Sequence, residues 1–96
     1  MNKYIIEREI AGIGAKDMHE LREAAQASNK VLAELAPHIQ WQESYVTGEK
    51  TFCVYLARDE EIIREHARLS GFPANRITEV RRMIDPTTAA LARVRS

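Results

Sequence analysis

Three histidines and one cysteine are the residues of this sequence that could offer a metal ion nitrogen or sulfur, and His66 is the most informative of them. It lies in the stretch REHARLSGFP, four residues after Ile62 and three after Ile63. On a helix, that spacing places it close to the side that packs inward. A histidine there either packs, with its ring hydrogen-bonded, or presents a ring nitrogen as a ligand. His19 and His38 are distant in sequence, and we expect both to be exposed.

Glu43 is the carboxylate that most needs an explanation. In a strand it shares one face with Trp41 and Tyr45. If a second copy covers that face, the charge of Glu43 becomes buried, which is costly unless a partner neutralises it. Glu43 then needs a proton, a metal ion or an arginine, for which Arg8, Arg81 and Arg82 are candidates on strands. It is either a structural ion pair or a contact to a metal or substrate.

Three further side chains extend this set. Glu7 and Glu9 share a face of the first expected strand with Ile5. Cys53, the one cysteine, is either a small buried apolar residue or a thiolate ligand. It excludes an intramolecular disulfide and fits a reducing compartment. Imidazole, thiolate and carboxylate together favour a divalent transition metal such as nickel, copper or zinc over calcium or magnesium.

The segments that must position these residues alternate between strand and helix patterns. Segments rich in β-branched and aromatic residues predict strands at residues 3–10, 39–47, 51–57 and 77–84. Apolar spacings of three and four predict helices at residues 17–36 and 59–70. The order βαββαβ is that of an α+β, ferredoxin-like fold, with a four-stranded antiparallel sheet and two helices on one face.

Local signals mark the helix ends. Asp17 and Asp59 are expected N-caps, and Glu20 completes a pattern like a capping box with Asp17. Pro37 ends the first helix, and Gly71 is a typical left-handed terminator for the second. Asp85-Pro86 breaks the last strand, and the residues beyond form a short frayed helix or a loose tail. We expect one domain over residues 1–88 and a C-terminal tail over residues 89–96.

Both faces of the central hairpin carry apolar residues. We expect Trp41 and Tyr45 on one face of their strand and Val46 on the other. In the next strand, Cys53 and Tyr55 are expected on one face, and the other face carries three apolar residues, Phe52, Val54 and Leu56. A sheet that is apolar on both faces needs two covers, and the helices supply only one. We therefore expect a two-fold homodimer.

Composition narrows the class of protein. The 96 residues are 45% hydrophobic and 29% charged, with a formal net charge of zero. That balance gives no electrostatic reason to expect a nucleic acid or a membrane surface as partner. The pattern of a signal peptide is absent from the first residues, and no apolar run approaches the roughly 20 residues of a membrane span. We expect a cytoplasmic protein. Motifs typical of phosphate-binding loops, nucleophile elbows and zinc proteases are also missing.

Four sequence blocks resemble a known family. SYV, CVY, REHA and GFPANR, within matching segments over about residues 3–88, are together specific for a family of small bacterial proteins. It is described as nickel-binding-protein-like, or as a domain of unknown function. The resemblance implies a ferredoxin-like fold, pairing into a dimeric α/β barrel, and nickel binding in some members. The matching blocks supply His66, Ser44, Tyr45, Cys53 and Tyr55; Glu43 directly precedes SYV, and Glu7 and Glu9 come from the first strand.

Three hypotheses follow. In the leading one, a homodimer binds nickel or another divalent transition metal for buffering or sensing rather than catalysis. His66 and Glu43 are its main ligand candidates, with Cys53 and Glu7 weaker; Tyr45 and Tyr55 would orient their neighbours. The rival is a small-molecule enzyme, resembling cofactor-free monooxygenases or isomerases, in which Trp41, Tyr45 and Tyr55 line a pocket and Glu43 or His66 moves a proton. The third is an interaction module in which Glu7, Glu9 and Glu43 form ion pairs.

Overall fold

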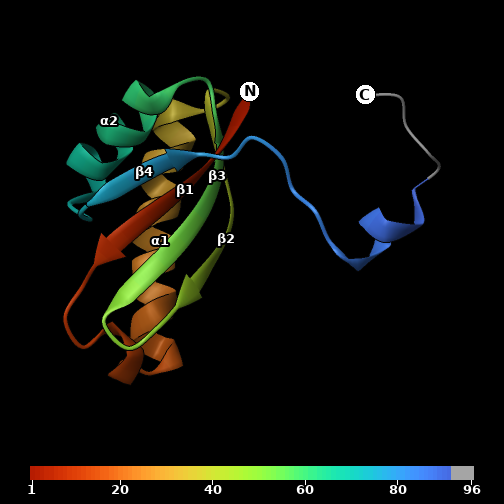
Figure 1. Cartoon of the computed structure of the whole chain (residues 1–96). Coiled ribbons are helices and arrows are strands. Elements are labelled where there is room, and N and C mark those ends of the chain that lie inside the picture. Colours follow the sequence, from red (N-terminus) through yellow and green to blue (C-terminus); the bar gives the residue numbers. More distant parts are fainter. Residues whose placement is uncertain (92–96) are drawn as a thin grey trace.

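The chain folds into one four-stranded sheet with both long helices on the same face. The computed structural model describes residues 1–91 (Figure 1). The strands are β1 (Asn2–Glu9), β2 (Ile39–Val46), β3 (Lys50–Ala57) and β4 (Arg76–Glu79). The helices are α1 (Met18–Leu35) and α2 (Glu60–Ser70), with short 3-10 turns η1 (Ile13–Ala15) and η2 (Pro86–Ala90). The strand order is β2-β3-β1-β4, and all neighbours are antiparallel. The predicted α+β, ferredoxin-like fold is confirmed.

The helix ends lie where the capping residues indicate. Asp17 accepts a hydrogen bond from the backbone N–H of Glu20 at 2.9 Å, and Asp59 accepts one from that of Ile62 at 3.0 Å. Gly71 ends α2 with a φ of 80°, a conformation that costs other residues roughly 1 kcal/mol or more. These local contacts fix where α1 and α2 begin and where α2 ends.

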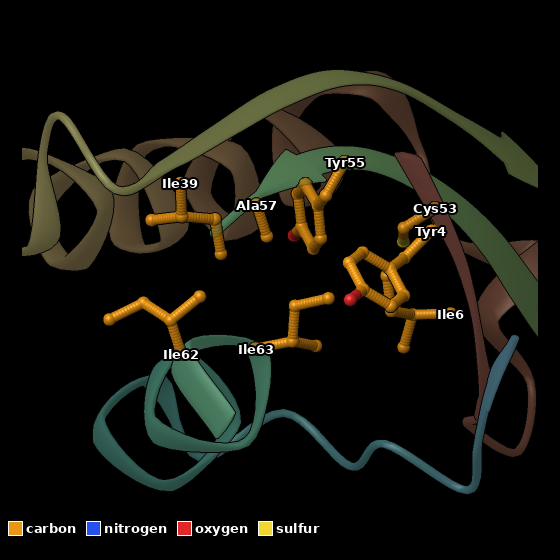
Figure 2. Packing of buried hydrophobic residues seen from close by; sticks show 8 residues of the cluster. All are labelled: Tyr4, Ile6, Ile39, Cys53, Tyr55, Ala57, Ile62 and Ile63. Atoms are coloured by element: carbon orange, nitrogen blue, oxygen red, sulfur yellow. The ribbon is translucent and has the colours of Figure 1, made fainter. Parts of the chain in front are cut away.

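The core lies between the sheet and the helices. Ile62 and Ile63 of α2 point towards the side chains of Tyr4, Ile6 and the inward residues of β2 and β3 (Figure 2). Ile6 and Ile63 are completely buried. We call this side of the sheet the helix face and the other side the open face.

A β-bulge in β2 overturns the predicted grouping of Trp41, Glu43 and Tyr45 on one face. Trp41 pairs with Tyr55, but the next paired residue is Glu43, which lies opposite Val54. The intervening Gln42 is the extra residue, so the alternation of side chains slips by one position. Trp41 therefore lies on the helix face, whereas Glu43 and Tyr45 lie on the open face.

The last strand is shorter than predicted. Strand β4 ends at Glu79 rather than at residue 84, so the prediction that Arg81 and Arg82 are strand residues was wrong. Residues 81–91, which we call the C-terminal arm, lead away from the sheet (Figure 1). Of the predicted tail over residues 89–96, residues 92–96 lie outside the described part. Across residues 1–91, neither helix combines the length and the apolar character needed to cross a bilayer.

Candidate functional site

Arg8 is the most unusual residue of the helix face, because its charge is buried. Its side chain is only 3% exposed. One guanidinium nitrogen donates to the Pro73 carbonyl at 2.7 Å and another to the Tyr55 hydroxyl at 3.3 Å. The guanidinium also lies about 6 Å from the ring centres of Tyr55 and Phe72, within cation–π range. Among residues 1–91 no carboxylate is in ion-pair contact with it.

His66 lies beside this arginine and is completely buried. Its Nε2 is 3.1 Å from the Ser28 hydroxyl, and its ring meets the Tyr55 ring edge-on, with centres 5.6 Å apart. Its Nδ1 is buried and has no hydrogen-bond partner among the described residues. Burial first, and the charge of Arg8 second, lower the pKa of His66 from 6.5 to about 4. The imidazole is therefore neutral at physiological pH.

Four elements bring these residues together. Arg8 and Tyr55 point to the helix face from the neighbouring strands β1 and β3, while Ser28 comes from α1 and His66 from α2. We call these four residues the polar cluster. Burial raises the pKa of the Tyr55 hydroxyl, and the positive charge of Arg8 partly opposes that rise. The cluster is therefore a neutral hydroxyl and a neutral imidazole held next to a permanent cation.

Cys53 lies on the same face and is also buried. Its Sγ is 3.6 Å from the Thr51 hydroxyl, two residues back along β3, and it packs with Tyr4 and Tyr55 in the core. The thiol is free and shielded from solvent. It fills space in the core, which is the packing role foreseen as one of its two possibilities.

The carboxylates of β1 and β2 lie on the open face instead. Glu7 is in reach of two cations, with Lys50 Nζ at 3.7 Å and Arg76 Nε at 3.9 Å from its oxygens. Glu43 accepts a hydrogen bond from the Tyr45 hydroxyl. Within the described chain, no basic side chain forms an ion pair with Glu43. Glu9 is exposed at the end of β1.

The predicted ligand set is thus divided between the two faces of the sheet. His66 and Cys53 are on the helix face, and Glu43 and Glu7 are on the open face. No three of the His, Cys, Asp and Glu side chains in residues 1–91 converge in a way that could hold a metal ion. The charge of Arg8, which already lowers the pKa of His66, would also repel a cation at that ring. One copy of the described chain therefore does not fit a metal ion by itself.

The predicted aromatic pocket is divided in the same way. Trp41 and Tyr55 lie on the helix face, where the Trp41 indole donates to the Ser44 hydroxyl at 2.9 Å, whereas Tyr45 lies on the open face. A surface hollow lies elsewhere, between η1 and the turn joining β2 to β3, and is lined by other residues, among them Leu21 and Val46. The three aromatic side chains do not line one pocket in a single copy.

Two members of the polar cluster were not recognised as such from the sequence. Arg8 was considered only as a partner for Glu43, although its alternation with Tyr4 and Ile6 places it on the buried face of β1. Ser28 lies at a buried position of α1, four residues before Leu32 on the side that packs inward. For Arg8 and Ser28 alike, the sequence indicates a polar side chain at an inward position. Buried polar groups need hydrogen-bond partners, so two such positions predict a buried polar contact.

Comparisons with known proteins agree with this fold. Residues 4–80 match a protein family described as nickel responsive protein SCO4226-like. Among solved structures, the crystal structure of SCO4226 from Streptomyces coelicolor A3(2) resembles this one with a TM-score of 0.72 at 15% sequence identity. The match covers 85% of this chain and 99% of that one. A search of curated proteins finds no match. Because the family match covers most of the sequence, this chain belongs to the SCO4226-like family of nickel responsive proteins.

Proposed function

We propose that the protein acts in the response to nickel as a homodimer that binds a divalent transition metal, nickel in the first place, for buffering or sensing. Family membership supports the link to nickel. The metal would lie between the open faces of two copies, because a single described chain offers no group of three suitable ligands.

The observation that carries this proposal is the environment of Glu43. It lies on a face whose central residues are apolar, and it has no basic partner in the described chain, unlike Glu7. A second copy that covers this face would take the Glu43 charge out of water, at a cost that only a cation or a proton removes. A metal ion between the copies supplies that cation. The two-fold axis also doubles each ligand, so Glu43 and Glu7 of both copies provide more oxygen donors than one chain can.

Nickel sites usually include imidazole nitrogen as well as oxygen. His66 is separated from the open face by the sheet, and its neighbour Arg8 disfavours a cation. His38 is exposed and directly precedes β2, the strand that carries Glu43. We therefore propose His38 of one copy as the nitrogen donor next to Glu43 of the other, because roughly 16 Å of strand separates the two residues within one copy. His66 and Cys53 stay candidates on the helix face, and the His66 variant below tests that face.

The test is a calorimetric titration of the metal-free, untagged full chain with nickel chloride. Glu43→Gln and His38→Ala should each weaken nickel binding at least tenfold, whereas Glu34→Gln, which removes an exposed carboxylate from α1, should not. His66→Gln should leave the affinity unchanged. Loss of affinity in His66→Gln with none in Glu43→Gln would place the metal on the helix face. Wild-type protein that takes up no nickel would refute metal binding, and a monomer at micromolar concentration by sedimentation would refute the dimer.

A further inference from the structure

The C-terminal arm carries apolar side chains that nothing in the described chain covers. Met83 is 67% exposed, Ile84 76% and Leu91 67%. Yet the arm has a defined local structure: Asp85 and Thr88 form a reciprocal capping box at the start of η2. A segment with local structure and exposed apolar side chains is typical of a surface that packs against another molecule.

The arm does not fold back onto its own sheet. The last backbone contact before it is the Val80 N–H, which donates to the Lys3 carbonyl at 2.8 Å. From there the chain continues away from the sheet (Figure 1). The residues from Val80 to Ile84 include neither glycine nor proline, the residues that most readily reverse a chain. The family match ends at residue 80, so the arm lies beyond the matched residues.

The open face carries apolar side chains that the described chain leaves partly exposed. Ile5 is 37% exposed there, and Phe52, Val54 and Leu56 are only half-buried. Ile5 pairs with Val54 across the two central strands, so these side chains form one continuous apolar surface. Both helices lie on the other side of the sheet (Figure 1) and leave this surface uncovered.

We infer that the C-terminal arm of each copy crosses the open face of the other copy, so that the two chains exchange arms. This inference rests on the homodimer of the proposed function and names the segment that closes it. Residues 81–85 in extended form span about 16 Å, enough to cross three strands spaced about 4.8 Å apart. Met83 and Ile84 would then lie against the apolar surface around Leu56 and Ile5, next to the end of β1 from which the arm starts. In this arrangement the partner's arm covers part of each open face, and the rest of that face, with Glu43, is turned towards the partner's sheet.

Photocrosslinking of the full chain tests which copy the arm contacts. The photoreactive residue benzoylphenylalanine replaces Ile84 in unlabelled chain, which is equilibrated with ¹⁵N-labelled wild-type chain before irradiation. We expect the arm to capture ¹⁵N-labelled peptides from β1 or β3, and the mass of the captured peptide reports its chain of origin. Capture of β1 or β3 peptides only from the unlabelled chain, within monomer-sized products, would show that the arm covers its own sheet and overturn the inference.

Sedimentation of point variants separates this inference from the proposed dimer. Met83→Ser with Ile84→Ser should raise the dimer dissociation constant by tenfold or more, as expected for two apolar side chains that lose their cover. Met18→Ser, at a methionine that is also mostly exposed and lies at the start of α1, is the control and should leave the dissociation constant unchanged. An unaltered dissociation constant in the double variant would refute the arm exchange while leaving the dimer intact. A wild-type chain that is monomeric throughout would refute both.

Discussion

The buried imidazole of His66 should make the stability of this protein fall as the pH falls below neutral. In the folded chain its pKa is about 4, compared with 6.5 for the free side chain. Between these two values the unfolded chain binds a proton at this residue and the folded chain does not. Acid therefore favours the unfolded chain. The stabilising contribution is fully present above about pH 6.5 and is lost as the pH falls to about 4.

The size of the effect follows from the same two values. A difference of one pKa unit between the folded and unfolded chains corresponds to about 1.4 kcal/mol. Protonation of His66 therefore lowers the free energy of unfolding by about 3 kcal/mol. A domain of this size has an unfolding free energy of roughly 5–15 kcal/mol, so the loss would be large. Protonation of His66 should accompany unfolding, because the ring is completely buried and a proton on it would disrupt its contacts.

Urea denaturation followed by circular dichroism at pH 7.5, 6.0 and 4.5 measures this loss. The control is His66→Gln, whose amide can keep a hydrogen bond to the Ser28 hydroxyl but does not titrate. Asp59, Glu65 and Asp85 have lowered pKa values, so they too reduce stability in acid, but they do so equally in both proteins. The wild type should lose about 2–3 kcal/mol more than the variant between pH 7.5 and 4.5. Parallel losses in the two proteins would show that His66 is not held neutral by burial.

Three further changes test the polar cluster and the helix end. Arg8→Met removes the neighbouring cation, so the pKa of His66 should rise, measured by NMR titration of the ring; an unchanged value would leave burial as the only cause. Ser28→Ala removes the partner of the ring and should cost about 1–3 kcal/mol in urea denaturation; no loss would mean that the contact is not formed. Gly71→Ala should cost about 1 kcal/mol through its positive φ, whereas Gly48→Ala, with open space at its Cβ, should cost little in thermal melts. Equal melting temperatures would contradict the backbone argument.

Local chemistry in the sequence was sufficient to predict the helices and the fold. The caps Asp17, Asp59 and Gly71 act within one turn of their own helix, so their partners are close in sequence. The order of strand and helix patterns then allowed few topologies. The predicted elements all exist, with ends shifted by a few residues.

The features that escaped prediction depend on contacts distant in sequence. The bulge at Gln42 is defined by pairing with β3, and alternation alone gives no sign of it. The hydrogen bonds made by the polar cluster join residues that are 38 to 65 positions apart, and only the packed fold brings Arg8 to Pro73 and His66 to Ser28. The short β4 ends where β1 ceases to pair with it, although the apolar pattern continues to Ile84.

The position of β1 has a consequence for the order of events during synthesis. This strand is made first, yet it lies between β3 and β4 and bonds to both. At translation rates of about 5–20 residues per second, its edges remain unsatisfied for several seconds until those strands leave the ribosome. During this interval the nascent chain exposes Ile5 and Ile6 of β1, together with Arg8, which the helices later bury. Newly made protein is therefore most vulnerable to chaperone capture or self-association before its last strand is complete.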